Sequence, residues 1–183
     1  MTRSQIKPMP EYFDRYINMT NEVDLKTALT ISLYELENAP IEKWNSLGNN
    51  TYAPNKWTVK DILQHLTDTE RVFSYRALSF ARGEKEVTPF DEENYGKLAN
   101  ATSRTLEDLI EEAILVRKST IKLFDSFTRE MSLKTGIGFK GEYSVLAIGF
   151  IIAGHQRWHV KVLEDKYYPL LINQIQVEGG SHS

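Results

Sequence analysis

The sequence predicts an all-α fold, a four-helix bundle with one long crossover connection. Four segments repeat apolar residues every three to four positions, and strand-like alternation is weak throughout the chain. The connection at residues 84–103 is long and the others are short, as in a bundle with one crossover. A chain of 183 residues can bury one core, so we expect a single domain at residues 1–172 and a polar, disordered tail at residues 173–183.

The first predicted helix follows an irregular start. Residues 1–20 are polar and contain two prolines, which favours an irregular lead-in. Leucine and alanine residues then recur at helical spacing over about residues 24–38. Pro40 interrupts this pattern, and residues 41–47 predict a short further helix before a loop at Gly48.

The second helix is predicted to begin at Thr58 and to end at Gly83. Thr58 and Asp61 resemble a capping box in which Asp takes the place of the usual Glu. An apolar stripe runs down one side of this helix and consists of Ile62, Leu66, Phe73 and Phe80. The row beside it consists of His65, Thr69, Val72 and Arg76.

Two more helices complete the predicted bundle. The long connection at residues 84–103 is expected to include a short helix. The third helix is predicted at about residues 105–127 and the fourth at about residues 144–166, with Pro169 as a stop signal. Residues 145–153 are apolar on nearly all sides, which indicates burial on more than one side. One side can face the bundle and the other the loops or a second subunit, so we expect a homodimer.

Composition and charge exclude several classes of protein. Without cysteine the chain has no disulfides, no thiolate nucleophile and no zinc finger. A net charge of −3 with no basic block disfavours nucleic-acid binding. The longest apolar run, residues 145–153, is too short to span a bilayer, and the first residues lack the apolar core of a secretory signal. We therefore expect a cytoplasmic protein without a membrane or nucleic-acid partner.

Three histidines form the strongest functional signal. His155 and His159 lie four residues apart, so their side chains share one face of the fourth helix. His65 flanks the apolar stripe of the second helix, and the remaining histidine, His182, lies in the tail. A divalent metal would satisfy all three inward-facing imidazoles and leave positions open, as in catalytic sites. The alternative is that each is a core histidine bonded to a carbonyl or carboxylate group.

Gln156 limits the chemistry of this site. The segment from His155 to His159 is similar to the metalloprotease motif H-E-x-x-H, but Gln156 replaces the general-base glutamate. A glutamine side chain cannot accept a proton from water. The pattern therefore excludes a zinc peptidase of this type, and a base or nucleophile has to come from elsewhere.

The histidine segments resemble those of a known family. In chain order they are Trp57-Thr58-Val59-Lys60 at a helix start, His65-Leu66-x-Asp68-x-Glu70, and Gly154-His155-x-x-x-His159. The chain resembles the DinB-like (DNA-damage-inducible) superfamily, which includes metal-dependent hydrolases of the YfiT type. The resemblance spans about residues 24–170, and the histidine segments are its specific part.

The resemblance implies a four-helix bundle with one long crossover and a metal site made by one histidine of the second helix and two of the fourth. By position these ligands are His65, His155 and His159, and all three are present. The implied metal is zinc or nickel. Characterised relatives include transferases and isomerases that use low-molecular-weight thiols such as bacillithiol, mycothiol or glutathione, and many members are dimers.

Further residues are candidates for the same site. Arg76 lies about three turns beyond the first histidine and is predicted to bind a carboxylate of the substrate or thiol; the alternative is a helix-end arginine paired with an acid. Trp158 and Trp57 are candidates for lining a substrate pocket, although such aromatic residues more often belong to the core. Asp68 and Glu70 are candidates for orienting a metal-bound histidine.

Three functional hypotheses follow. The first is a metal-dependent enzyme that transfers a low-molecular-weight thiol to an electrophilic small molecule. The second is a metal-dependent hydrolase that uses metal-bound hydroxide at the same site. The third is a non-catalytic stress protein that binds a metal or a small molecule. The sequence points to no catalytic base and to no particular substrate.

Overall fold

A capping side chain begins each of the four long helices. The side-chain oxygens of Asp24, Thr58, Thr105 and Ser144 each accept a hydrogen bond from the backbone N–H three residues later. At Thr58 the predicted capping box is confirmed, because the Asp61 carboxylate accepts the backbone N–H of Thr58 at 2.9 Å. Polar side chains placed just before apolar repeats therefore determine where the helices begin.

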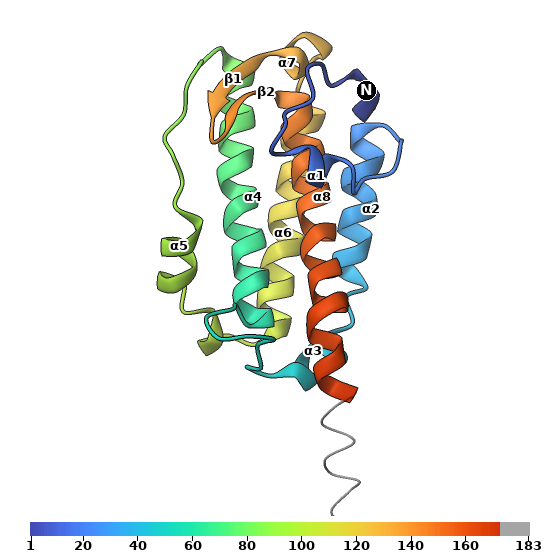
Figure 1. Ribbon diagram of the computed structural model, residues 1–183. Helices are drawn as coiled ribbons and strands as arrows, with labels where there is room; N and C mark the ends of the chain where they lie inside the picture. The colour runs from blue at the N-terminus through green and yellow to red at the C-terminus, as the bar shows by residue number, and fades with distance from the viewer. Residues whose placement is uncertain (173–183) are drawn as a thin grey trace, which may run out of the picture.

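The computed structural model describes residues 1–172, so the predicted tail lies outside the described residues. The long helices α2 (Leu25–Glu37), α4 (Val59–Arg82), α6 (Leu106–Asp125) and α8 (Val145–Val162) pack side by side as a bundle (Figure 1). The predicted all-α four-helix fold is confirmed. None of the helices in the described part of the chain has the length and apolar character needed to cross a membrane.

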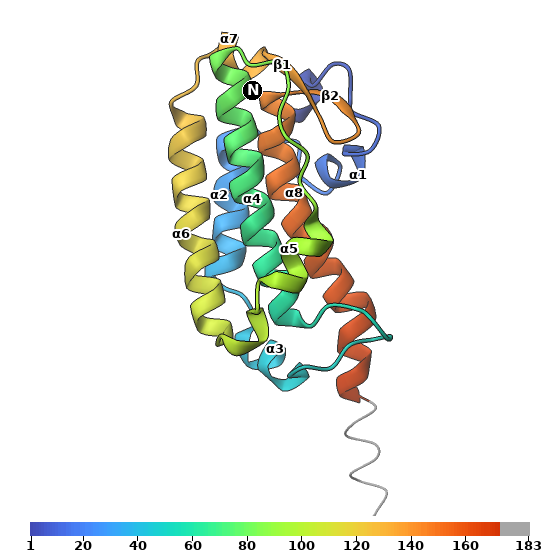
Figure 2. The same cartoon turned by 90° about the vertical axis from the view of Figure 1, so that its left-hand side faces the viewer.

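Short helices and one crossover connect the long ones. α3 (Ile41–Leu47) follows Pro40, as the sequence predicts. The crossover between α4 and α6 carries α5 (Glu92–Leu98) and a 3₁₀ turn, Ala101–Ser103. This crossover returns along the outside of α4, and α5 packs against α4 (Figures 1 and 2). α5 thus lies alongside the middle of the bundle.

A small hairpin, absent from the sequence-based prediction, covers one end of the bundle. After α7 (Arg129–Leu133), β1 (Thr135–Gly138) pairs antiparallel with β2 (Gly141–Ser144) (Figure 1). Its turn has positive φ at Lys140 (65°) and at Gly141 (120°), and the second position is accessible because glycine has no Cβ. Strands of four residues are too short to produce a recognisable alternation, which explains the omission.

The end of the last helix differs from the prediction. Pro169 does not stop it: α8 continues as a π-helical stretch, Leu163–Tyr167, and then as helix through residues 168–172. A proline inside a helix lacks an N–H and collides with the carbonyl group four residues earlier, and a wider π turn relieves both problems. The local widening therefore lets the helix pass the proline.

The N-terminal lead-in has a structural role that its polar composition does not indicate. It includes α1 (Asp14–Ile17), which packs against α8 together with the buried side chains of Phe13 and Ile17. The expected burial of α8 on more than one side is confirmed, but the cover is the chain's own residues 1–20. The apolar surface that suggested a homodimer is therefore buried within one chain and is not exposed.

The core consists of two apolar clusters with a polar layer between them. One cluster contains Phe73 and Phe80 of α4, and the other contains Ile62 and Leu63 of the same helix. Buried polar residues lie between these levels on all four long helices: Ser32, His65, Thr69, Glu70, Arg117, His155 and Gln156. Polar groups held in the middle of a bundle need partners, and this layer contains the candidate site.

Candidate metal centre and its two cavities

The three predicted histidine ligands meet in the polar layer. One turn of α8 separates His155 from His159, and α4 presents His65 to both. The Nε2 atom of His155 lies 3.2 Å from that of His65 and 3.0 Å from that of His159. Three ring nitrogens from two helices therefore point at one another.

Burial keeps these imidazoles uncharged. It lowers the pKa of His65 to about 3, with a smaller contribution from His159. It lowers the pKa of His159 to about 4. For His155, burial and then the neighbouring histidines hold the pKa well below its ordinary value. At neutral pH all three rings are neutral and offer lone pairs rather than charges.

The donor set fits a divalent transition metal. Two imidazole nitrogens bound to a tetrahedral metal at roughly 2.0–2.1 Å lie about 3.3 Å apart. The two Nε2–Nε2 distances of 3.2 and 3.0 Å are close to that spacing. Neutral imidazole is a ligand for zinc, nickel, copper or iron, and three such ligands leave coordination positions open.

The residues that surround the histidines differ in part from the prediction. Thr69 Oγ1 lies 3.3 Å from Nδ1 of His65, in the place where a carboxylate was expected. Glu70 is held by Arg117, whose Nε and Nη2 donate to its two oxygens at 2.8 and 2.9 Å. Asp68 accepts from the side-chain amide of Gln64. Within residues 1–172, neither Asp68 nor Glu70 forms a hydrogen bond with a histidine, and other side chains bind both carboxylates.

Gln156 belongs to the helix contact and not to the histidine cluster. Its side-chain amide donates to the backbone carbonyl of Ser32 on α2 at 2.9 Å. The side chain of Gln156 therefore holds α8 against α2 and does not take the place of the general-base glutamate of a peptidase.

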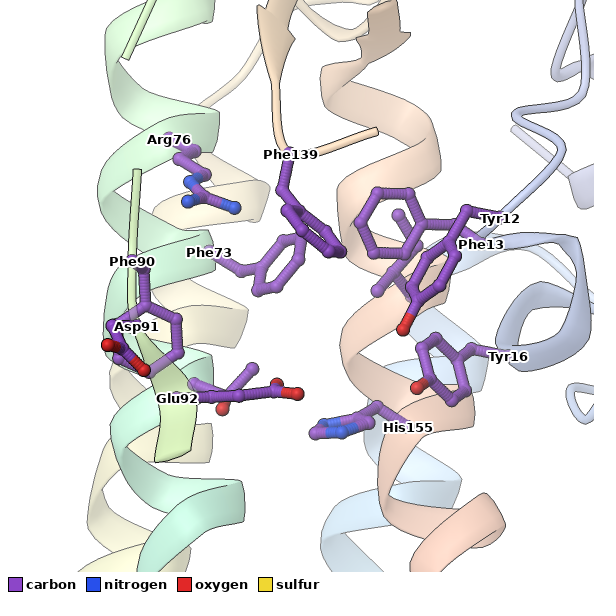
Figure 3. Close-up of a pocket in the computed structure, with 12 residues that line it drawn as sticks. Tyr12, Phe13, Tyr16, Phe73, Arg76, Phe90, Asp91, Glu92, Phe139 and His155 are labelled. Carbon is purple, nitrogen blue, oxygen red and sulfur yellow. The ribbon is translucent and has the colours of Figure 1, made fainter. Parts of the chain in front are cut away.

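An aromatic cavity of about 210 Å³ reaches the centre through His155. Its apolar walls come from the lead-in, α4, the crossover and the hairpin: Tyr12, Phe13, Tyr16, Phe73, Phe90 and Phe139 (Figure 3). Tyr16 packs edge-on against the His155 ring at a centroid distance of 4.9 Å. Burial raises the pKa of Tyr16, so its phenol remains a neutral hydrogen-bond donor.

Arg76 and Glu92 are the charged side chains of interest in the aromatic cavity. Arg76 is buried at the end opposite His155 (Figure 3). It is neither a surface arginine nor paired with an acid among residues 1–172, so the alternative interpretation from the sequence is wrong. Glu92 extends its carboxylate toward the His155 end (Figure 3), and partial burial raises its pKa.

A second cavity, the lysine cavity, reaches the centre through His159. It has a volume of about 530 Å³ and is lined in part by Lys56, Lys97, Trp57 and Tyr52. The Trp57 ring lies 4.6 Å from the His65 ring between centroids, which confirms Trp57 as a pocket residue. α5 contributes to both cavities, with Glu92 in the aromatic cavity and Lys97 in the lysine cavity.

Trp158 does not line either of these two cavities. Its ring packs edge-on against Tyr16 at 5.7 Å between centroids. Trp158 thus touches the wall of the aromatic cavity through Tyr16, and substrate binding by Trp158 itself stays a prediction.

Sequence reasoning missed the aromatic residues of the lead-in and the carboxylate of Glu92. Tyr12, Phe13 and Tyr16 stand at spacings that place them on one side of a short helix, and that was the available signal. Glu92 stands in a run of three acidic residues, a pattern typical of a solvated loop or helix start, and nothing local indicates that the crossover folds back onto the histidines.

A comparison against protein families covers most of this chain. The model of the DinB superfamily matches residues 21–163, a range that contains all four long helices and all three histidines. The chain belongs to the DinB superfamily. The lead-in residues Tyr12, Phe13 and Tyr16 precede the part matched to the DinB superfamily, so one wall of the aromatic cavity comes from outside it.

A solved structure is similar to this DinB-superfamily fold. YfiT from Bacillus subtilis, described as a probable metal-dependent hydrolase with an unusual four-helix bundle topology, matches with a TM-score of 0.65 and 14% sequence identity. The match covers 88% of this chain and 89% of that chain, and it supports the bundle fold. No curated protein matches the chain.

Proposed function

We propose that this protein is a metal-dependent enzyme that transfers a low-molecular-weight thiol to an electrophilic small molecule. His65, His155 and His159 hold the metal, with zinc or nickel as the expected ion. The observation that carries the proposal is that two separate cavities reach one cluster of three neutral histidines, through His155 and through His159. A hydrolase needs room for one substrate and water, whereas a transferase needs room for two substrates.

The two cavities differ in chemistry, which supports binding of the thiol in one and of the electrophile in the other. Lys56 and Lys97 outweigh the single carboxylate of Glu93 in the lysine cavity, and the net positive charge suits an anionic thiol such as bacillithiol, mycothiol or glutathione. The aromatic walls of the other cavity suit an electrophile with an apolar body. A divalent metal, when bound, supplies the positive charge that ionises a thiol beside it. The sulfur then bonds to the electrophilic carbon, the leaving group departs with its electron pair, and Glu92 accepts the thiol proton.

The hydrolase remains a second candidate because of Glu92. Its carboxylate lies in the aromatic cavity with His155, and burial, followed by the charges of Glu93 and Asp91, raises its pKa. A carboxylate with a raised pKa suits the acceptance of a proton from a water molecule. In this version the water molecule, and not a thiol, attacks the substrate.

One assay separates these functions. The metal-loaded protein is incubated with glutathione and chlorodinitrobenzene, and its metal content is measured in parallel. Thiol-dependent conjugation that disappears after metal removal supports the transferase. Consumption of an ester or amide substrate without thiol supports the hydrolase, and bound metal with neither activity supports a binding protein. A purified protein that takes up no zinc and no nickel contradicts both enzymes.

The role of Glu92 has a matched control in its neighbour. Glu92→Gln should lower turnover by about 10²–10⁴-fold, the usual range for losing a proton-transfer group, without loss of metal. Glu93→Gln changes the adjacent carboxylate, which faces the lysine cavity, and should leave the proton transfer intact. Equal effects of both variants on turnover would show that Glu92 has no special role.

The proposal includes a cytoplasmic location and a homodimer. The homodimer now rests on the family resemblance, since residues 1–20 cover the apolar side of α8. Sedimentation equilibrium at micromolar concentration tests it, and a single species of monomer mass would contradict it.

A further inference from the structure

Arg76 carries a buried positive charge that no acidic side chain among residues 1–172 neutralises. The residue is 2% exposed, and within residues 1–172 it makes one hydrogen bond, from Nη1 to the hydroxyl oxygen of Tyr143 at 3.3 Å. Nε and Nη2 have no acceptor among residues 1–172, although both atoms are buried. The face of the Phe73 ring, 5.1 Å away, gives only partial compensation. An unpaired buried charge is unfavourable, so a site that retains one is built for a missing partner.

The vacant atoms form one edge of the guanidinium group. Nε and the adjacent Nη2 present two parallel N–H groups, the fork that matches the two oxygens of a carboxylate. Arg117 uses this same pair in this protein, donating from Nε and Nη2 to the two oxygens of Glu70 at 2.8 and 2.9 Å. Arg76 has its third nitrogen occupied and this carboxylate-binding edge free.

The surroundings of Arg76 limit the shape of the partner. Figure 3 shows Arg76 at one end of the aromatic cavity and His155 at the other, with the ring of Phe73 between them. The cavity volume of about 210 Å³ is below the roughly 300–1,000 Å³ of pockets for drug-sized ligands. Asp91 and Glu92 also line the cavity, and neither pairs with Arg76 in this structure. The space suits one ring or a short branched chain attached to a carboxylate.

We propose that the aromatic cavity binds a small carboxylic acid with an aromatic or branched apolar body. Its carboxylate takes the free edge of Arg76, and its body lies along Phe73 toward His155. Placing the reactive group of the acid at the histidine end rests on the proposed function. The carboxylate site itself does not, because Arg76 lies at the far end of the cavity from the metal centre.

Calorimetry with phenylpropionate and its uncharged amide tests this site. The full-length protein is titrated with each compound, once loaded with zinc and once after metal removal. We expect phenylpropionate to bind in both forms and the amide to bind at least about tenfold more weakly, since hydrogen bonds to charged groups are the stronger ones. Binding of both compounds with equal affinity would overturn the proposal.

Variants of α4 identify the group that binds the carboxylate. Arg76→Gln should weaken phenylpropionate binding by about tenfold to a hundredfold, and Arg76→Lys should restore only part of it. Arg82→Gln, which removes an exposed arginine of the same helix, is the matched control and should bind like the wild type. Circular dichroism checks folding, and Arg76→Gln should be at least as stable as the wild type because an unpaired buried charge is gone.

A second variant keeps the test decisive if Arg76→Gln misfolds. Ile151→Phe narrows the aromatic cavity from the α8 side and leaves Arg76 in place, so it should also abolish binding. If Arg76→Gln still binds phenylpropionate and metal removal abolishes that binding, the acid binds to the metal and the proposal is overturned. Metal content and turnover of the wild type, measured separately, test the proposed function whatever the result here.

Discussion

Gly154 of α8 lies directly against the backbone of Tyr16. A Cβ atom at this position would stand 1.8 Å from the carbonyl oxygen of Tyr16, so any other residue would displace the lead-in. This close approach brings the Tyr16 ring against His155. One glycine beside a metal-ligand candidate thus determines how closely the wall of the aromatic cavity approaches the centre.

Gly154→Ala should loosen the lead-in without removing the metal ligands. The added methyl group meets backbone, which cannot move alone, so we expect a loss of about 1–3 kcal/mol in the free energy of unfolding. Gly149→Ala is the matched control, because its methyl group would meet side chains and no backbone: the flexible end of Leu25 and, at 3.0 Å, the ring of Phe124. Urea unfolding measures both variants, and an equal loss would show that the contact with Tyr16 is unimportant.

His155→Ala should abolish metal retention and leave the protein largely helical. His155 is the histidine whose Nε2 lies close to both others, so its loss leaves two ligands without the central one. Elemental analysis after dialysis, with circular dichroism for the fold, measures the effect. His182→Ala removes the remaining histidine of the sequence and serves as the control. Full metal occupancy in His155→Ala would show that the ligand set is wrong.

Thr69→Val should weaken metal binding without removing it. The Thr69 hydroxyl lies 3.3 Å from Nδ1 of His65 and holds the orientation of that ring. Loss of such an outer contact typically lowers metal affinity by about 10–100-fold. Competition with a chelating dye measures the affinity. An affinity equal to that of the wild type would assign the orientation of His65 to the Trp57 ring alone.

Arg117→Met should be among the most destabilising changes in the bundle. Arg117 donates to both oxygens of Glu70 and to the hydroxyl of Ser32, and all three residues are buried. Its removal leaves the Glu70 carboxylate buried and unpaired, which typically costs about 3–5 kcal/mol. The double variant with Glu70→Met should recover much of this loss. A single variant as stable as the wild type in urea would contradict the importance of the pair.

Alkaline pH should destabilise the wall of the lysine cavity through Tyr167. Burial raises the pKa of Tyr167 from 10.0 to about 12, and its hydroxyl donates to the backbone carbonyl of Trp57. Below pH 10 the phenol is protonated in folded and unfolded chains alike, so its contribution is fully present. Between about pH 10 and pH 12 only the unfolded chain ionises, and the contribution is lost. Tyr167→Phe should flatten this part of the stability profile, measured by thermal unfolding.

The sequence predicted the bundle and the three histidines because both depend on local spacing. Apolar repeats mark α4 and α8, and the i and i+4 positions of His155 and His159 determine a shared face. The hairpin and the passage of the helix beyond Pro169 were missed. One depends on strands too short to show a period, and the other on a π turn that leaves no signal in the sequence.

Partners of buried charges could not be predicted in the same way. Glu70 was expected near a histidine because both lie on one stretch of α4, but Arg117 of α6 takes both of its oxygens. The burial of Arg76 depends on the hairpin, since Tyr143 of β2 binds it. Such contacts join residues far apart in the chain, and a single sequence contains no record of them.

The separation of the three histidines along the chain has a consequence for the lifetime of the protein in the cell. His65 and His155 are 90 residues apart, and they meet only when α4 and α8 have packed together. An ion that binds this site and not the unfolded chain raises the free energy of unfolding by mass action, by about 2.7 kcal/mol at a hundredfold excess over Kd. Supply of the ion would then control the abundance of the protein as well as the activity proposed for it. Molecules made during starvation for the metal would be the first that proteases remove.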